Sequence, residues 1–450
     1  MDIISNVYGF LKDVMQDPEI SLIGLSVADK DTVLFDHKLK PYIKNGKQLV
    51  FSITKSVTSL GIGILYDQGL IGLDDPIVKY FKEELPLNYD RKINDITIRH
   101  LLTMSSGIDS ENIFEMLRST DWRKLYFNSK FTAIPGTFYK YSSITTHMLS
   151  AIVSKVTNKP LEELIKTHIF DVLDIKNYSW EMAPEGTSFG GFGLSLDESS
   201  LVKLGQLLLN EGTYLGKRVV SKAYLDLATA PQVIKQDYVN NPNTVSIGYQ
   251  YGFQFHVSPN LSYRADGAFG QIIVIYNNLV IVTLSQYANY EHLYAYVYKH
   301  FNNQPVIKAR KEVLNDYLKD LSLISKGSEL KVIKNESYLL PDNELNIKKV
   351  SFNKDHVKFT YLDHKEDIFD FNYDQKSYGN SLFIKDLYLR YQPHFVVTNW
   401  VDASKLILKV YYVETPAVAT YTFKFDAKFL EFDSKVACHF IYQGFNIKSL

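Results

Sequence analysis

The chain has 450 residues, of which 46% are hydrophobic and 22% are charged. This composition is ordinary for a globular protein and leaves room for two or three hydrophobic cores, which argues against a disordered chain. The 49 Lys and Arg residues balance 50 Asp and Glu residues, for a net charge of -1. No strong field therefore attracts nucleic acid or an anionic membrane surface.

The first residues, MDIISNVYGFLKDVMQD, place apolar side chains at the spacing of an amphipathic helix. They lack the basic start and the continuous apolar stretch of a secretion signal. No apolar run in the chain approaches the roughly 20 residues that a membrane span needs. The single cysteine, Cys438, excludes an internal disulfide and a multi-cysteine metal site. We therefore expect a cytoplasmic protein with no membrane span.

Two β-rich runs, SLIGLSVA and TVLFDH, flank the polar residues 29–31 and indicate a hairpin. Residues 49–69, LVFSITKSVTSLGIGILYDQG, then change from a short apolar run to a helical pattern at Ser52. Apolar side chains recur there at helical spacing, and small residues lie between them. This pattern predicts a buried central helix.

Ser52 and Lys55 lie three residues apart, which places them one turn apart on one face, at the positive end of a helix that starts at Ser52. A serine hydroxyl is a weak nucleophile near neutral pH. An adjacent amine accepts its proton only when burial and nearby positive charge keep that amine partly neutral. Ser-x-x-Lys also begins at Ser200, Ser328 and Ser351, so the spacing alone does not identify a nucleophile.

The segment ITIRHLLTMSSGID at 96–109 predicts a short helix that Thr97 caps and that residues 105–107 end in a turn. His100 lies inside this helix. We interpret it as a histidine that bonds nearby backbone, because no partner for a general base is in view.

The turn at 135–137, Pro-Gly-Thr, is followed by a largely aromatic stretch and by a helical pattern that begins at Ser142. Tyr141 therefore lies at a loop-to-helix junction, where a side chain is held firmly while its tip faces a cleft. We interpret His147, on the same helix, as a packing residue.

The glycine-rich GGFGLS at 190–195 predicts a close-packed turn before a leucine-rich helix. It has no following phosphate-loop Lys-Ser/Thr and no strand before it, so nucleotide binding is rejected. From 246 to 286 the pattern changes to strands and predicts an antiparallel meander. EHLYAYVYKHF then predicts a closing helix.

Clean alternation of apolar and polar residues marks the last part of the chain, as in Val357, Phe359 and Tyr361. Such strands are half-buried and suit a separate antiparallel barrel or sandwich. We therefore expect a first domain at 1–305, a linker at 306–330 and a β domain at 331–450.

A Ser-x-x-Lys on a buried helix, a tyrosine at a helix entrance and a glycine-bearing strand later in the chain together resemble the serine β-lactamase and penicillin-binding-protein superfamily, and most closely its class C and esterase branch. The resemblance covers about residues 20–300. The segments that carry it are FSITKSVTS at 51–59, LDDPIVKYF at 73–81, ITIRHLLTMSSGID at 96–109, PGTFYKYSS at 135–143, GGFGLSLDESSLVKLGQLLLNEG at 190–212 and ADGAFGQ at 265–271. The resemblance implies an α+β domain, an antiparallel sheet flanked by helices with a helical subdomain, ahead of the β domain.

The resemblance also implies the roles of individual residues. Ser52 would be the acylated nucleophile, Lys55 its proton acceptor, and Tyr141 a proton relay to the leaving group and the deacylating water. The oxyanion hole would come from the backbone NH groups of Ser52 and Ala268, with Gly267 letting the substrate lie close.

Two positions depart from the family pattern. Ser143 stands where the second motif usually has Asn; its hydroxyl reaches less far and has one donor instead of two. Ala265 stands where the third motif usually has Lys or His, so an anionic substrate loses a partner for its carboxylate. Arg264 is next to it, but strand alternation points Arg264 to the opposite face.

We therefore expect a serine hydrolase that cleaves a small ester or amide, with neutral or bulky substrates favoured, and with no cofactor or metal. The alternatives are a D,D-peptidase or β-lactamase, and a weakly catalytic binding protein on the same fold. The β domain would form a lid over the cleft or recruit a partner.

Overall fold

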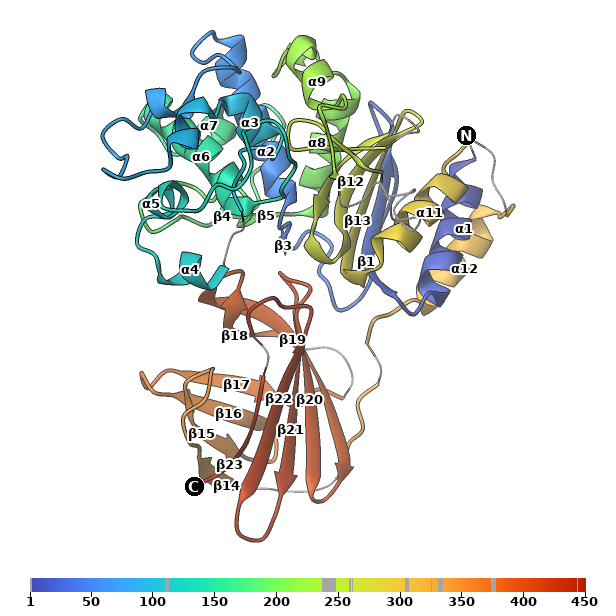
Figure 1. Ribbon diagram of the computed structural model, residues 1–450. Helices are drawn as coiled ribbons and strands as arrows, with labels where there is room; N and C mark the ends of the chain where they lie inside the picture. The colour runs from blue at the N-terminus through green and yellow to red at the C-terminus, as the bar shows by residue number, and fades with distance from the viewer. Residues whose placement is uncertain are drawn as a thin grey trace. The chain divides into compact units, whose positions relative to one another are not determined.

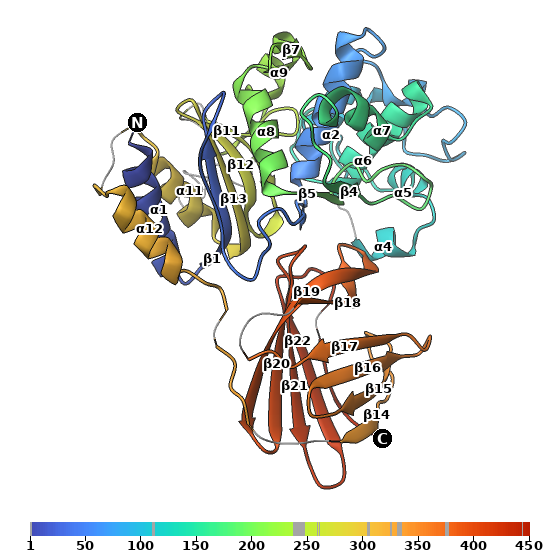
Figure 2. The same cartoon turned by 180° about the vertical axis from the view of Figure 1, so that it is seen from behind.

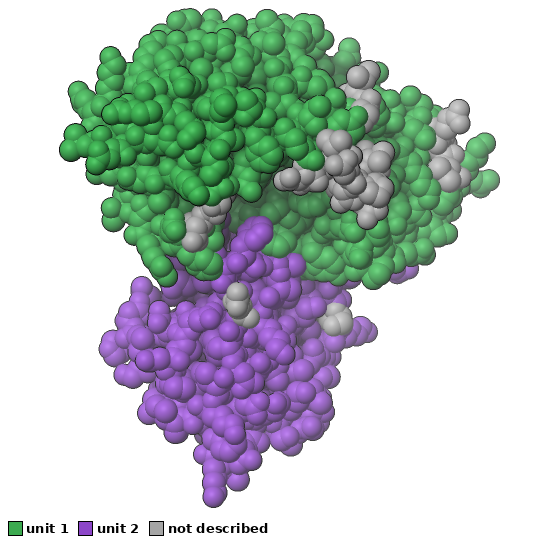
Figure 3. All heavy atoms as spheres, viewed as in Figure 1, with its two compact units in different colours: residues 1–37, 49–317 green, residues 38–48, 318–450 purple. Residues whose placement is uncertain are grey.

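The computed structural model describes residues 2–109, 113–236, 248–258, 260, 262–303, 307–324, 326–330, 335–373, 378–442 and 444–450. The chain divides into two compact units, coloured green and purple in Figure 3. The first comprises Met1–His37 and Leu49–Tyr317, and the second comprises Lys38–Gln48 and Leu318–Leu450.

An antiparallel sheet forms the centre of the first unit. Its strands lie in the order β2-β1-β13-β12-β11-β10-β9-β8 among the described residues. They are β1 (Ile20–Ala28), β2 (Val33–Lys38), β8 (Val233–Ile234), β9 (Gln250–Tyr251), β10 (His256–Val257), β11 (Tyr263–Gly267), β12 (Gln271–Tyr276) and β13 (Leu279–Ala288). Strands β9 to β13 are neighbours in chain order, which confirms the predicted meander; residues 246, 247, 259 and 261 of that prediction lie outside the described residues.

Helices cover both faces of this sheet. Helices α1 (Ile3–Gln16) and α11 (Tyr290–His300) lie on one face, and α8 (Glu198–Leu209) lies on the other (Figures 1 and 2). Strand β13 is accordingly buried from its first residue to its eighth, as expected of a strand covered on both sides.

Helix α2 (Ile53–Asp67) is the central helix that the sequence predicts, since residues 53–65 are all buried. Its glycines permit this packing. A Cβ on Gly61 would lie 2.8 Å from Leu161, and one on Gly63 would lie 2.5 Å from Tyr224. Both distances are too short for a side chain.

The remaining described helical elements lie in the first unit, apart from Lys311–Asp320, which continues past Tyr317 into the second unit. They are α3 (Ile98–Leu102), α4 (Ile113–Arg118), α5 (Trp122–Phe127), α6 (Ser143–Thr157), α7 (Leu161–Ile165), α9 (Lys222–Ala228), α12 (Lys311–Asp320), the 3-10 turns Ile77–Lys79, Arg91–Asp95 and Ala268–Gly270, and the π turn Lys166–Phe170. A small sheet of β3 (Gln48–Leu49), β5 (Leu194–Leu196) and β4 (Tyr178–Trp180) and a hairpin of β6 (Thr213–Tyr214) and β7 (Lys217–Arg218) complete the first unit. In the described part of the chain, no helix is both long and apolar enough to cross a bilayer.

Helix α3 begins as its sequence predicts. The Thr97 hydroxyl accepts from the His100 backbone NH at 3.3 Å, and His100 Nδ1 accepts from the Thr97 NH at 3.2 Å. The two residues form a reciprocal cap. The interpretation of His100 as a histidine that bonds nearby backbone is therefore confirmed.

The second unit is all β. Its described strands form two sheets. One sheet contains β14 (Glu336–Leu339), β15 (Ile347–Phe352), β16 (His356–Tyr361) and β17 (Glu366–Asp370). The other contains β18 (Tyr378–Lys385), β19 (Tyr388–Asp402), β20 (Lys405–Tyr412), β21 (Val418–Phe425), β22 (Leu430–Ala437) and β23 (Phe445–Lys448). The two sheets share one core, in which the Phe352 ring lies 5.1 Å from Phe423 and the Phe359 ring lies 5.6 Å from Phe432. Among the described residues the strands form two sheets and no closed barrel, so the sandwich alternative describes this unit.

Residues 38–48 belong to the second unit, although the sequence analysis placed them in the 1–305 domain. Tyr378 donates its hydroxyl to the Pro41 carbonyl at 2.7 Å, and the Gln48 side-chain amide donates to the Val413 carbonyl. The division near residue 317 falls inside the expected linker, which contains helix α12.

Candidate active site

Ser52 sits on a strained turn at the start of α2. The Val50 NH donates to the Leu194 carbonyl at 2.9 Å, which fixes this turn to β5. Phe51 follows with a φ of 48°, a left-handed conformation that bulky residues seldom adopt outside functional turns. Ser52 is the residue before the helix, yet its hydroxyl does not cap the helix. The hydroxyl therefore stays available at the positive helix end.

Lys55 lies one turn further and is only 1% exposed. Its Nζ lies 3.3 Å from Ser52 Oγ and 3.0 Å from Ser143 Oγ, and it donates to the Gly191 carbonyl at 2.6 Å. It also lies 4.8 Å from the centre of the Tyr141 ring. These contacts hold the amine next to the serine hydroxyl.

Tyr141 and Ser143 reach Lys55 from the entrance of α6. The Ser142 hydroxyl accepts from the Thr145 NH at 3.1 Å and so defines the first turn of that helix. Tyr141 lies just before the cap and is 38% exposed. This is the loop-to-helix junction that the sequence predicts, with the ring both packed and accessible.

The glycine pair at 190–191 brings a further segment to the lysine. A Cβ on Gly190 would lie 2.6 Å from the Thr146 carbonyl, and one on Gly191 would lie 2.7 Å from the Ser143 carbonyl. Only glycine permits this approach to α6. The glycine-rich pattern predicted a close-packed turn, but no feature of the pattern indicated that the Gly191 carbonyl binds Lys55.

Strand β11 approaches the turn that bears Ser52. A Cβ on Gly267 would lie 2.1 Å from the Val50 carbonyl, so the residue must be glycine for the two segments to meet. Beyond it, Tyr290 donates its hydroxyl to the Gly267 carbonyl at 2.6 Å and accepts from the Gly270 NH at 3.1 Å. These bonds fix the turn that contains Ala268.

The two turns also touch through aromatic rings. Phe269 has a φ of 63°, like Phe51 a left-handed value. The two rings meet edge to face with centroids 5.3 Å apart. Ser52 and Ala268, whose NH groups are the predicted oxyanion donors, are the residues next to this ring pair.

Ala265 is buried, at 1% exposure, and carries no charge. Its neighbour Arg264 turns toward α11, as strand alternation predicts. There the guanidinium lies 4.3 Å from the Tyr294 ring centre, donates to Ser258 Oγ at 2.6 Å and pairs with Asp266 at 3.1 Å.

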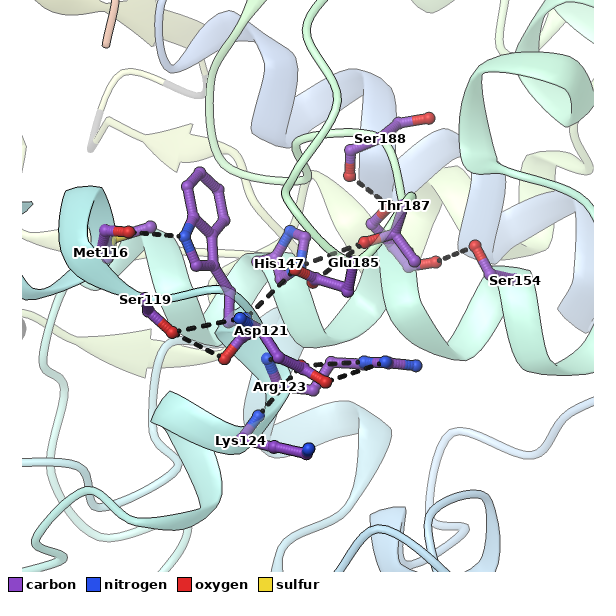
Figure 4. A network of polar contacts seen from close by, with 12 residues as sticks. Met116, Ser119, Asp121, Arg123, Lys124, His147, Ser154, Glu185, Thr187 and Ser188 are labelled. Carbon is purple, nitrogen blue, oxygen red and sulfur yellow. Dashed lines mark hydrogen bonds and ion pairs between the residues drawn. The ribbon is translucent and has the colours of Figure 1, made fainter.

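A buried contact between His147 and Glu185 supports α6. His147 Nε2 and Glu185 Oε1 lie 2.6 Å apart, and the Trp122 NH donates to the same carboxylate at 3.1 Å. Figure 4 shows His147 and Glu185 pointing toward each other, with Thr187 beside them. Burial alone would raise the pKa of Glu185, but these bonds lower it to about 2. His147 therefore does more than pack, because it holds the segment that leads to Gly190.

The described residues contain one group with metal-binding geometry, formed by Asp17, Glu19 and His292, with ligand atoms within 4.8 Å of one another. Two of the three are exposed. His292 Nδ1 lies 2.8 Å from Asp17 and 3.4 Å from Glu19, so an ordinary ion-pair cluster accounts for it.

Comparison with known proteins places the first unit in a known family. The family model Beta-lactamase matches residues 10–296. The 6-aminohexanoate-dimer hydrolase of Paenarthrobacter ureafaciens is 24% identical over 217 residues, which are 44% of this chain and 54% of that protein. The chain thus spans about half the length of the first curated relatives that it matches, at 56% and 54%.

Two solved structures share the fold. A putative 6-aminohexanoate-dimer hydrolase from Bacillus anthracis superposes with a TM-score of 0.53 at 19% identity, over 66% of this chain and 83% of that one. The octameric penicillin-binding protein homologue from Pyrococcus abyssi superposes with a TM-score of 0.53 at 17% identity, over 100% of both chains. The second likeness therefore extends to the all-β unit. The family match, which covers more than half of the chain, shows that the protein belongs to the beta-lactamase family.

Proposed function

We propose that the protein is a serine hydrolase that cleaves an ester or an amide through an acyl-enzyme on Ser52. The contact between Lys55 Nζ and Ser52 Oγ, at 3.3 Å, carries this proposal. Ser143 and the Gly191 carbonyl hold the same amine from the other side. A preorganised base beside a hydroxyl at a helix start is the arrangement that nucleophilic catalysis requires.

In the first step, Ser52 Oγ attacks the substrate carbonyl carbon and its proton passes to Lys55. The carbonyl oxygen gains a negative charge, which the NH groups of Ser52 and Ala268 stabilise. Tyr141 then delivers a proton to the leaving oxygen or nitrogen as its bond to the carbonyl carbon breaks. In the second step, water loses a proton to the same groups, attacks the acyl carbon and releases the acid, which restores the Ser52 hydroxyl.

Neutral substrates fit this site best. Ala265 offers no cation to a substrate carboxylate, and Arg264 is bonded to Asp266 and Ser258. A charge-assisted hydrogen bond contributes about 1.5 to 3 kcal/mol, so its absence weakens an anionic substrate by about ten- to a hundred-fold. The name of the Paenarthrobacter relative, a hydrolase of an aminohexanoate dimer, makes amides a class to test beside esters.

A binding protein without catalysis is the competing function. It would need a pocket but no aligned proton acceptor. The position of Lys55 between Ser52, Ser143 and the Tyr141 ring favours the hydrolase.

The test is covalent labelling of the full chain with a fluorophosphonate, followed by peptide mapping. We expect one labelled residue, Ser52, and no label in Ser52→Ala. Lys55→Ala should lose nearly as much activity on an aryl ester as Ser52→Ala, because members of a catalytic unit act together.

Lys203→Ala is the matched control, since Ser200 and Lys203 repeat the spacing on α8, where Lys203 donates to the Asp174 carbonyl at 2.8 Å. This control should keep the parent activity. Equal labelling of Ser52→Ala, or Lys55→Ala activity close to that of Lys203→Ala, would refute the mechanism.

A further inference from the structure

A second buried lysine lies near this site, and the steps above do not use it. Lys235 follows β8 and is 1% exposed. Its Nζ lies 3.3 Å from His256 Nδ1 on β10. An ammonium group only donates, so Nδ1 accepts, and the neutral ring carries its hydrogen on Nε2, toward Asp266 Oδ2 at 3.8 Å. The next residue, Gln236, accepts from the Tyr139 NH at 3.3 Å.

His256 connects Lys235 with the groups around Ser52. The His256 and Tyr141 rings have centroids 6.4 Å apart, and Lys55 Nζ lies 4.8 Å from the Tyr141 ring centre. The His256 ring thus lies between Lys235 and Tyr141 in this series of contacts, and Lys55 contacts the same tyrosine.

Among the residues that the structure describes, the titratable and charged groups around Lys235 come from three strands and from the entrance of α6. They are Tyr251 on β9, His256 on β10, Arg264 and Asp266 on β11, and Tyr141 before α6, with Lys55 of α2 beyond it. Arg264 and Asp266 are bonded to each other at 3.1 Å, so their opposite charges largely offset at the distance of Tyr141.

Within this cluster, Lys235 is the group whose pKa lies near neutrality. Burial, and then the charge of Arg264, lower the pKa of Lys235 to about 7, against the opposing effect of Asp266. Burial lowers the pKa of His256 to about 3. Near neutral pH the His256 imidazole is therefore uncharged, and the charge of the Lys235–His256 pair depends on the protonation of Lys235.

We propose that Lys235 is a positioning residue of the Ser52 site, whose positive charge favours proton loss from the groups that activate Ser52. This inference rests on the proposed function. A cation near Tyr141 and Lys55 favours the deprotonated form of both, so the direction of the effect is the same whichever of them accepts the serine proton. Because Ala265 carries no charge, Lys235 supplies this field from the segment that follows β8.

The experiment measures the rate of Ser52 labelling by a fluorophosphonate as a function of pH, in the parent chain and in Lys235→Met and Lys235→Arg. Methionine keeps a long apolar side chain without the charge, and arginine keeps the charge at every pH used. In Lys235→Met we expect the midpoint of the acidic limb to move up by about one pH unit. Lys235→Arg should keep the midpoint of the parent or move it down.

The alkaline side gives a second readout that a purely structural role would not move. There the groups that activate Ser52 are deprotonated in every variant, so the rates of the parent, Lys235→Met and Lys235→Arg should converge, whereas a structural defect would lower the rate of a variant at every pH. An unshifted acidic midpoint in folded Lys235→Met overturns the proposal.

If circular dichroism shows that both variants are unfolded, the pH profile of the parent chain alone tests the proposal. Its labelling rate must then show two ionisations across the neutral range, and a profile with a single ionisation overturns the proposal. Absence of any Ser52 labelling in the parent would instead refute the proposed hydrolase function, so the two failures are distinguishable.

Discussion

Gly267→Ala is the perturbation whose effect on the proposed activity follows most directly from the geometry. A Cβ at this position would lie 2.1 Å from the Val50 carbonyl oxygen, whereas ordinary contact begins at 3.4 Å. Strand β11 and the turn before Ser52 must therefore separate by about 1.3 Å to reach ordinary contact. Both contacting groups are backbone, so no side chain can rotate away.

This separation acts on the two proposed oxyanion donors, since Ser52 follows Val50 by two residues and Ala268 follows Gly267 directly. A misplacement of about 1 Å can lower a rate about a hundred-fold, which corresponds to about 2.7 kcal/mol of lost transition-state stabilisation. We therefore expect kcat/KM for a neutral aryl ester to fall about a hundred-fold, mainly through kcat.

Gly205→Ala is the matched control, because its Cβ would lie 2.2 Å from Val280 on β13, in the core between α8 and the sheet. Overpacking of this kind costs about 1 to 3 kcal/mol of stability. The control should lower the unfolding temperature while the folded enzyme keeps its kcat/KM. If folded Gly267→Ala retains the kcat/KM of the parent, or if Gly205→Ala loses as much, then β11 and the Ser52 turn do not form the oxyanion site.

Three further outcomes follow from the structure. The pKa of Glu185 lies at about 2 in the folded protein, below its ordinary 4.5. This lowered pKa contributes about 3 kcal/mol to the free energy of unfolding. The contribution is present above pH 4.5 and is lost as the pH falls toward 2. Thermal unfolding of Glu185→Gln should show a deficit at neutral pH that shrinks in acid, and curves that stay parallel would contradict this. Ala265→Lys should improve kcat/KM for a cephalosporin relative to a neutral ester by about ten- to a hundred-fold, and an unchanged ratio would show that another group supplies the cation. Residues 318–450 expressed alone should give a β-type circular dichroism spectrum, and a peptide of residues 38–48 should raise their unfolding temperature; a helical spectrum, or no effect of the peptide, would count against this division of the chain.

The sequence by itself determined the features that depend on neighbouring residues. Ser52 and Lys55 come together because three residues make nearly one helical turn, and the small residues of α2 indicate its burial. Thr97 and His100 cap α3 through bonds within one turn. Alternation of apolar and polar residues predicted the second unit as all β, because successive side chains of a strand point to opposite faces.

Only the tertiary structure decided which distant segments meet. The Gly191 carbonyl that holds Lys55 is 136 residues away along the chain, and the Glu185 partner of His147 is 38 residues away. No local pattern encodes such pairs, because each depends on how whole elements pack and on which buried polar groups then need partners. The sequence did not indicate that residues 38–48 belong to the second unit or that Lys235 lies beside His256. The reason is the same, because these groups become neighbours only in the folded chain.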